Sequence, residues 1–179
     1  MSNLSLAGWL ERLEQLHPSA IDLGLNRCGE VARRLDLVDT GIITATVAGT
    51  NGKGTTVAVM ESVLCASGVH CGAFTSPHLI RFNERIRVDG QEVSDETIIA
   101  AFEAIERARE EISLTYFEFG ALAALWIFKT FNVQYQLLEV GLGGRLDAVN
   151  IIDADVTVIA AIGLDHQEWL GETVDGMGV

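Results

Sequence analysis

An apolar, β-branched run that ends in a glycine- and lysine-containing loop is the feature that most constrains this fold. Residues 41–49 read GIITATVAG, the loop TNGKGT follows, and residues 52–68 continue as an alanine- and valine-rich stretch that ends at Gly68. β-Branched runs favour strands, and Gly68 is a typical helix C-cap. Glycines let backbone N–H groups approach an anion closely, because no Cβ blocks them. The sequence therefore predicts a buried strand, a phosphate-binding loop and a helix in succession.

The spelling of this loop departs from the usual phosphate-binding pattern, G-x-x-x-x-G-K-[ST]. Val47 stands where the first glycine is expected, and Gly54 separates Lys53 from Thr55. An ordinary glycine-rich turn is the alternative interpretation. The strand before the loop, the helix after it and the Asn-Gly-Lys within it favour a nucleotide, with Lys53 reaching the β and γ phosphate oxygens and the N–H groups of residues 51–54 around the β phosphate.

The rest of the chain alternates in the same way between helical and strand patterns. Buried strands are predicted at residues 69–75, 133–141 and 154–163, and the Asp89-Gly90 pair predicts a hairpin within residues 85–93. Helices are predicted over residues 5–16, through Val31 and Leu35, after Ser94 as far as Ile112, and after a capping box of Thr115 and Glu118. This alternation predicts an α/β fold, with a mostly parallel sheet and flanking helices.

Composition limits the class of protein. With 179 residues, 49% of them hydrophobic, the chain is long enough for one globular domain. The net charge of −13 argues against nucleic acid and anionic membranes as partners. The longest apolar stretch, residues 119–128, is too short to span a membrane, and the N-terminus does not resemble a signal peptide. Three scattered cysteines indicate reduced thiols, so we expect a cytoplasmic protein with a small-molecule ligand.

Several polar residues follow the predicted strands, where ligands of open parallel sheets collect. Glu139 ends one strand, Ser76 follows another in TSPH as an oxygen ligand with His78 as a hydrogen-bonding group, and His166 follows a third in GLDH. Taken singly, each is more typical of a turn or of the surface. Together they predict a site for a divalent cation at the carboxyl edge of the sheet.

The stretch GLGGRLDAVN, residues 141–150, contains G-x-G-G but precedes no helix of the dinucleotide-binding kind, so we reject that interpretation. Arg145 and Asp147 within it have two readings, contact with a polar substrate or a local ion pair in a flexible loop. No set of Ser, His and Asp, or of Cys and His, is placed for covalent catalysis.

The motifs AGTNGKGT, SPHL, NERIRV, TYFEF, LEVGLGGRLDAVN and GLDH occur in this order across nearly the whole chain. In this respect the chain resembles the folylpolyglutamate synthase/dihydrofolate synthase family, within the Mur ligase superfamily. GTNGKG[ST], with its extra glycine, is this family's own form of the phosphate loop. The resemblance implies a fold similar to P-loop NTPases, that of the Mur ligase central domain, here incomplete.

The resemblance also implies roles for individual residues. ATP contacts are implied for Thr50, Asn51, Gly52, Lys53, Gly54 and Thr55. Two Mg²⁺ sites are implied, one held by Ser76 and Glu139 and the other by His166, with Lys53 and His166 as catalytic residues. Three segments are implied to line a pterin pocket, and their residues are Asp22, Leu23, Gly24, Thr115, Tyr116, Phe117, Glu118, Leu146, Asp147 and Ala148. The capping box alone also explains Glu118, and both roles stay open.

The implied activity is ATP-dependent ligation of L-glutamate to dihydropteroate and to reduced folates, through an acyl phosphate. The full-length form is expected to be a monomer. The family's C-terminal domain and the lysine that follows its LDH motif are absent here, so residues 1–179 are expected to be a partial N-terminal ATP-binding domain, inactive alone. Two alternatives remain: a Mur-type amide ligase acting on another carboxylate substrate, such as a peptidoglycan precursor, and a non-catalytic nucleotide-binding module.

Overall fold

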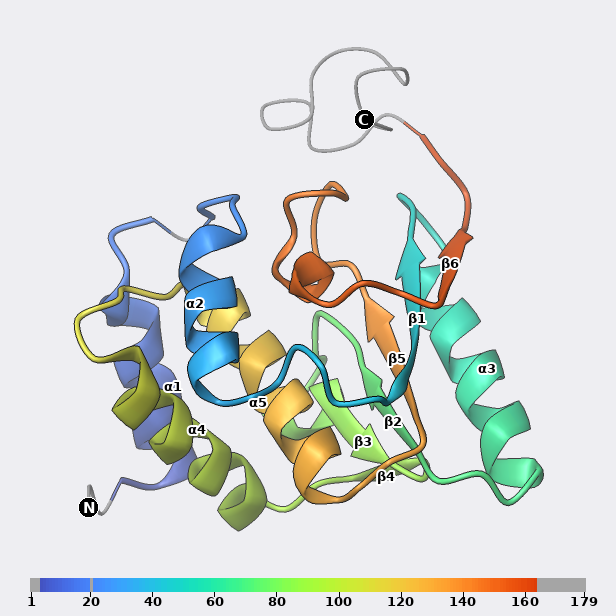
Figure 1. Ribbon diagram of the computed structural model, residues 1–179, viewed down its shortest axis with the longest axis horizontal. Coiled ribbons are helices and arrows are strands. Elements are labelled where there is room, and N and C mark those ends of the chain that lie inside the picture. Colours follow the sequence, from blue (N-terminus) through green and yellow to red (C-terminus); the bar gives the residue numbers. More distant parts are fainter. Residues whose placement is uncertain (1–3, 20, 164–179) are drawn as a thin grey trace.

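A six-stranded sheet with helices on both faces forms the centre of the molecule (Figure 1). The computed structural model describes residues 4–19 and 21–163. The strands, in the order in which they lie in the sheet, are β4 (Gln91–Glu92), β3 (Ile86–Val88), β2 (Cys71–Phe74), β5 (Tyr135–Glu139), β1 (Ile43–Ala48) and β6 (Val156–Ile159). The last four are parallel to one another, whereas β3 and β4 are antiparallel. The predicted α/β fold with a mostly parallel sheet is confirmed.

The helices divide unequally between the two faces of the sheet (Figure 1). Of the helices in the described residues, α3 (Lys53–Ala66) alone lies on one face, while the other is covered by α1 (Leu6–Leu16), α2 (Asn26–Arg34), α4 (Asp95–Arg109) and α5 (Tyr116–Thr130). Two short 3-10 helices, η1 (Phe82–Arg85) and η2 (Ala148–Ile151), lie in the connections. None of the helices in the described residues is long and apolar enough to cross a membrane.

Side-chain capping fixes where the predicted helices begin. The Ser94 hydroxyl accepts a hydrogen bond from the Thr97 N–H at 3.3 Å, at the start of α4. At the start of α5, the Thr115 hydroxyl accepts from the Glu118 N–H at 3.2 Å, and the Glu118 carboxylate accepts from the Thr115 N–H at 2.7 Å. The predicted capping box is therefore present, and it satisfies backbone donors that have no partner within the helix.

Alternation along the strands separates two hydrophobic cores. In β2 and β5, Phe74 and Leu138 belong to the large core beneath α1, α2, α4 and α5, whereas Ala73 and Leu137 face α3. Side chains point to opposite faces at every second residue, so adjacent residues serve different cores. The two central strands are therefore buried on both faces. The buried polar residue Gln136 of β5 is satisfied by a hydrogen bond that its side chain donates to the Thr44 hydroxyl at 2.7 Å.

Two local predictions are wrong. The strand β6 was expected to be buried, but Val156 is 51% exposed and Ile159 63% exposed, because β6 lies at the edge of the described sheet and pairs with β1. The helix after Ser94 was expected to include Ile112, but α4 ends at Arg109. Glu110 has a φ of +51°, which ends the helix before Ile112, although Ile112 still packs against the large core.

Candidate active site

The loop between β1 and α3 has the left-handed backbone that its glycines predict. Gly52, which immediately precedes α3, has a φ of +86°, and no side chain caps that end of the helix. The Lys53 side chain folds back over the loop, where Nζ donates hydrogen bonds to the carbonyl oxygens of Gly49 at 2.7 Å and Thr50 at 3.3 Å. The loop is thus a compact turn at a helix N-terminus that carries one ammonium group, an arrangement suited to phosphate oxygens.

Residues after β6 shape the same loop, which sequence patterns did not reveal. The N–H groups of Thr50 and Asn51 donate to the Ala161 carbonyl at 2.8 and 3.2 Å. The Thr50 hydroxyl donates to the Gly163 carbonyl at 2.9 Å and accepts from the Gly163 N–H at 3.0 Å. In this structure, the Asn51 N–H expected to contact phosphate is therefore engaged by the chain beyond β6.

Glu139 and Ser76 meet beside the start of α3, although they are far apart in the sequence. The Glu139 carboxylate is 4% exposed and accepts a hydrogen bond from the Ser76 N–H at 3.0 Å. A Cβ on Gly54 would lie 3.7 Å from both of its oxygens, so the carboxylate is close to the helix N-terminus. Burial raises the pKa of Glu139, while the Ser76 N–H, the Lys53 and Arg87 charges and the Gly54 N–H oppose that rise.

The donor set at this point fits a hard cation only in part. A carboxylate and a hydroxyl are oxygen ligands of the kind that Mg²⁺ takes. Among residues 4–19 and 21–163, however, no group of three or more His, Cys, Asp and Glu side chains is placed to hold a metal ion. His166, the predicted ligand of a second ion and a predicted catalytic residue, lies outside the described residues.

A cavity of about 1040 Å³ begins at Lys53 and extends between the sheet edge and the helical layer. Lys53 and Ser76 line it together with the three segments predicted to contact a pterin, that is, Asp22, Leu23, Gly24, Thr115, Tyr116, Phe117, Glu118, Leu146, Asp147 and Ala148. The five other predicted loop residues do not line the cavity; they are Thr50, Asn51, Gly52, Gly54 and Thr55. The fold therefore joins the nucleotide-like loop and the predicted pterin segments in one cavity.

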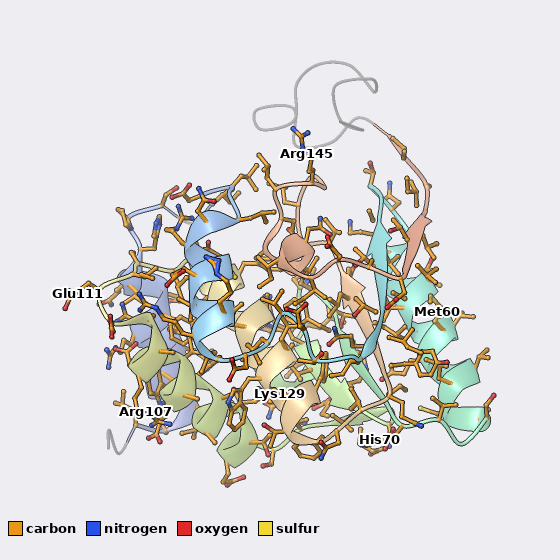
Figure 2. All side chains as sticks on the ribbon, in the orientation of Figure 1. Met60, His70, Arg107, Glu111, Lys129 and Arg145 are labelled. Atoms are coloured by element: carbon orange, nitrogen blue, oxygen red, sulfur yellow. The ribbon has the colours of Figure 1, made fainter. Side chains whose placement is uncertain are left out.

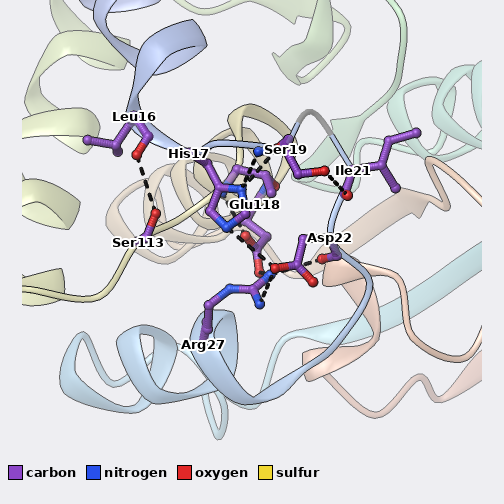
Figure 3. Close-up of polar contacts among 9 residues, drawn as sticks. Leu16, His17, Ser19, Ile21, Asp22, Arg27, Ser113 and Glu118 are labelled. Carbon is purple, nitrogen blue, oxygen red and sulfur yellow. Dashed lines mark hydrogen bonds and ion pairs between the residues drawn. The ribbon is translucent and has the colours of Figure 1, made fainter.

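An ion network holds two of these segments together (Figure 3). The Arg27 guanidinium lies 2.7 Å from the Asp22 carboxylate and 3.1 Å from the Glu118 carboxylate, and it also donates to the Asp22 carbonyl at 2.9 Å. His17 Nε2 lies 3.4 Å from Asp22 Oδ2 on the other side. Glu118 thus both caps α5 and binds Arg27. Arg27 was missed from the sequence because its partner lies 91 residues away.

Asp147 holds the third segment in place through backbone donors. Its carboxylate is 3% exposed and accepts from the N–H groups of Gly141, Leu142 and Val149 at 3.0, 2.9 and 3.1 Å. Burial raises the pKa of Asp147 to about 6, and these three hydrogen bonds oppose the rise. The alternative of a local pair with Arg145 is wrong, since Arg145 is exposed at the outer tip of its loop (Figure 2).

Arg85 and His78 line the same cavity as Lys53 and the pterin segments, and no role was predicted for Arg85. The Arg85 guanidinium lies 5.6 Å from the centre of the Phe82 ring and 5.5 Å from that of Tyr116. Its Nε donates to His78 Nδ1 at 2.7 Å. Burial, and secondarily the positive charge of Arg85, lower the pKa of His78, so the imidazole accepts this hydrogen bond in its neutral form.

Comparison with known proteins gives one consistent answer. The chain is 54% identical over 173 residues to the dihydrofolate synthase/folylpolyglutamate synthase of Escherichia coli, a match that covers 97% of this chain and 41% of that protein. The Haemophilus influenzae protein of the same name is 49% identical, with 94% and 38% covered. No family model matches the chain. The chain spans about two fifths of the length of these curated relatives.

Solved structures agree with the sequence matches. The structure of E. coli FolC in complex with DHPP and ADP superposes with a TM-score of 0.96 at 53% identity, covering 98% of this chain and 42% of that one. The Yersinia pestis bifunctional folylpolyglutamate synthase/dihydrofolate synthase, complexed with AMPPNP and Mn ion, gives 0.92 at 51% identity, with 98% and 43% covered. Sequence and fold thus agree with the motifs, and the chain belongs to the folylpolyglutamate synthase/dihydrofolate synthase family.

Proposed function

We propose that this chain supplies the ATP-binding and acceptor-binding part of a ligase that joins L-glutamate to dihydropteroate and to reduced folates. The observation that carries the proposal is the shared cavity, in which Lys53 of the phosphate loop and all three predicted pterin segments take part. A ligase that activates a carboxylate with ATP needs this arrangement, because the phosphoryl donor and the acceptor must meet without diffusing apart.

The loop end of the cavity is proposed to bind ATP and Mg²⁺. Lys53 and the N-terminus of α3 provide positive charge for the phosphates, and the left-handed backbone at Gly52 forms the turn. Ser76 and Glu139 would hold a Mg²⁺ ion, which neutralises charge on phosphate oxygens when it is bound. Relatives have been solved with ADP, or with AMPPNP and Mn, which supports a nucleotide and a divalent ion here.

The far end of the cavity is proposed to bind the pterin ring. Its walls combine the aromatic ring of Phe117 and the apolar side chain of Leu146 with the buried carboxylates of Glu118 and Asp147. A flat heterocycle with amino and ring N–H donors suits such a site, since apolar walls cover its faces and carboxylates accept from its edge. The relative solved with DHPP and ADP supports an acceptor ligand in this part of the fold.

In the proposed reaction, a carboxylate oxygen of the acceptor attacks the γ-phosphorus of ATP, which gives an acyl phosphate and ADP. The amine of L-glutamate then attacks the acyl carbon, the amide bond forms, and inorganic phosphate and a proton leave. Lys53 offsets the negative charge on the transferring group, and the walls position the acceptor. No covalent enzyme nucleophile takes part, and the protein acts by placing groups and balancing charge.

The domain, oligomeric state, location and partners of the protein are also proposals. We infer that residues 1–179 form a partial N-terminal ATP-binding domain, that the full-length form is a monomer in the cytoplasm, and that its partners are small molecules rather than nucleic acid or membranes. The acidic net charge of −13 supports the absence of anionic macromolecular partners, and the three cysteines are free thiols.

Glutamate incorporation tests the proposal. A chimaera, in which this chain replaces the matching two fifths of the E. coli relative, is incubated with ATP, Mg²⁺, labelled L-glutamate and either dihydropteroate or a reduced folate. Labelled dihydrofolate and extended folates are expected. Label found only with a peptidoglycan precursor would identify a Mur-type ligase, and ATP binding without any incorporation would identify a nucleotide-binding module. Either result would contradict the proposal.

A further inference from the structure

Arg85 is set apart from the other arginines by its lack of an acidic partner. Within residues 4–19 and 21–163, only Arg85 and Arg145 have no carboxylate within ion-pair distance; the arginines that have one are Arg12, Arg27, Arg33, Arg34, Arg81, Arg87, Arg107 and Arg109. Arg145 is exposed, so water solvates its charge, whereas Arg85 is half-buried in the cavity wall. In a chain with a net charge of −13, a half-buried guanidinium without an acid is unusual.

The Arg85 side chain is held in one orientation. Phe82 and Tyr116 pack against the guanidinium at ring distances of 5.6 and 5.5 Å, and His78 accepts from Nε at 2.7 Å. In the described residues, no hydrogen bond uses the two terminal nitrogens. These nitrogens form one edge of the planar fork that binds carboxylates with two parallel hydrogen bonds. The stacking and the His78 contact therefore orient the fork before any ligand arrives.

The position of Arg85 relates it to the reacting end of the acceptor. Arg85 lines the same cavity as Lys53, and the segment from Ser76 to His78 connects it to the Glu139 carboxylate, which bonds to the Ser76 N–H. Tyr116, which packs on Arg85, begins the helix that carries the pterin-segment residues Phe117 and Glu118. Arg85 thus stands between the phosphate loop and the proposed pterin end.

We propose that Arg85 binds the carboxylate of the acceptor substrate and so selects acids over otherwise identical molecules. This inference rests on the proposed function, which puts the pterin ring at the far end of the cavity and the phosphoryl donor at Lys53. The carboxylate that becomes phosphorylated lies between those two points. A guanidinium fork at that place supplies the missing counter-charge for the carboxylate and orients one of its oxygens toward the phosphate loop.

The test compares two ligands in two variants of the 179-residue chain. Binding of dihydropteroate, and of an analogue in which hydrogen replaces the carboxyl group, is measured by quenching of the pterin fluorescence. Arg85→Met removes the charge but keeps a side chain that packs on Phe82 and Tyr116. Arg145→Met is the matched control, because Arg145 is the other described arginine without a carboxylate and does not line the cavity.

We expect Arg85→Met to weaken dihydropteroate binding by about 10- to 100-fold, the usual range for a charge-assisted hydrogen-bond pair. Binding of the analogue without the carboxyl group should change by less than about threefold, as should both ligands in Arg145→Met. Arg85→Lys should recover only part of the preference for the acid, since an ammonium group lacks the fork.

Four results would overturn the proposal. An unchanged preference for the acid in Arg85→Met would remove the role of Arg85 and leave the proposed function intact. An equal loss for both ligands would show that Arg85 only maintains the pocket. A loss of AMPPNP or L-glutamate affinity with dihydropteroate unaffected would assign Arg85 to another anion. If the unchanged chain bound neither pterin ligand, the proposed acceptor site itself would fail, and the Arg85 proposal with it.

Discussion

The two ends of the cavity are built in different ways. The phosphate loop of the nucleotide end is one continuous stretch, residues 49–56, which has left-handed glycines before α3 and is also held by the chain after β6. The acceptor end is assembled from residues 22–24, 115–118 and 141–148, which meet only in the folded chain. Arg27 joins the first two of these segments, and the Gly24 N–H donates to the Leu146 carbonyl at 3.2 Å to join the first and third.

Because of this difference, the residue proposed to act on phosphate is not one that stabilises the fold, whereas residues of the acceptor end do both. At the nucleotide end, the hydrogen bonds of the Lys53 ammonium within the described part of the chain go to carbonyl oxygens of its own loop, so its removal should cost the fold little. At the acceptor end, Glu118 and Asp147 line the cavity and also support the fold, and Arg27 supports the wall through its ion pair with Glu118. Mutations at the two ends should therefore differ in whether a loss of function is accompanied by a loss of stability.

The largest effect is expected for Lys53→Met at the nucleotide end. In the chimaera, ligation should fall by about a thousandfold or more, because the point charge on the transferring phosphoryl group is lost. Dihydropteroate binding and the free energy of unfolding should stay close to those of the unchanged protein. Lys129→Met is the control: Lys129 also donates to carbonyl oxygens, those of Leu35 and Asp36, but it does not line the cavity. Near-normal turnover of Lys53→Met at saturating ATP would contradict the assignment of the loop.

Asp147→Asn should change how stability depends on pH. Burial raises the pKa of Asp147 from 3.8 to about 6, so the folded state binds the proton more tightly than the unfolded state. The stabilisation from this group is complete below about pH 4 and is lost as the pH rises through about 6. A pKa change of about two units corresponds to about 3 kcal/mol.

Urea unfolding of the unchanged chain and of Asp147→Asn between pH 4 and pH 7 measures the contribution of Asp147 to the free energy of unfolding. The free energy of unfolding of the unchanged chain, minus that of Asp147→Asn, should fall over this range by about 2–3 kcal/mol. Taking the difference removes the contributions of all other carboxylates. A constant difference would show that the backbone donors and Lys53 balance burial at Asp147, and a difference that rises with pH would show that they outweigh it.

Arg27→Met should weaken both the fold and the acceptor site. The substitution leaves the Glu118 carboxylate, which is 3% exposed, without its cation. We expect the free energy of unfolding to fall by about 2 kcal/mol. This is less than for a fully buried pair, because the Arg27 side chain is 29% exposed. Arg33→Met is the control, since its pair with Glu30 is on the surface and should contribute less than about 0.5 kcal/mol. Chemical denaturation, with a double-mutant cycle through Glu118→Gln, separates the pair from general packing. Equal stability of Arg27→Met and Arg33→Met would contradict this account.

Gly141→Ala should act on the acceptor end alone. A Cβ at Gly141 would lie 2.5 Å from the Phe117 ring, so the ring must move within the cavity wall. We expect dihydropteroate affinity to fall by about tenfold, or about 1.4 kcal/mol, with nucleotide affinity unchanged. Gly144→Ala is the matched control in the same loop, because a Cβ there would meet no atom within 4 Å. Equal effects of Gly141→Ala on both ligands would remove the distinction between the two ends.

The glycine loop of the nucleotide end could be predicted from local sequence, whereas the assembly of the acceptor end could not. The succession of strand, glycine loop and helix, the capping box of α5 and the hairpin at Asp89-Gly90 depend on neighbouring residues, and all three are present as expected. The pterin segments were located through the family's motifs rather than from any local pattern. Their convergence in one cavity depends on contacts between residues far apart in the sequence, those of Arg27 with Asp22 and Glu118 and that of the Gly24 N–H with the Leu146 carbonyl.

Residues that act through distant partners escaped sequence reasoning. Arg27 occurs in a stretch with no motif, and its partner Glu118 already had a local explanation as a cap. Arg85 lies in the predicted hairpin and in the NERIRV motif, but no role was predicted for it, because its surroundings come from η1, His78 and α5. These two positions stand out only when each arginine of the folded chain is compared with the carboxylates around it.

Hydrogen exchange of backbone amides, measured by mass spectrometry on the chain with each ligand separately, tests most directly whether one cavity has two chemically distinct ends. With AMPPNP and Mg²⁺, slower exchange is expected in peptides covering residues 49–56 and 76–78. With dihydropteroate, slower exchange is expected over residues 22–27, 115–118 and 141–149. The same set of peptides protected by both ligands, or dihydropteroate protecting the loop at residues 49–56 instead, would contradict the account.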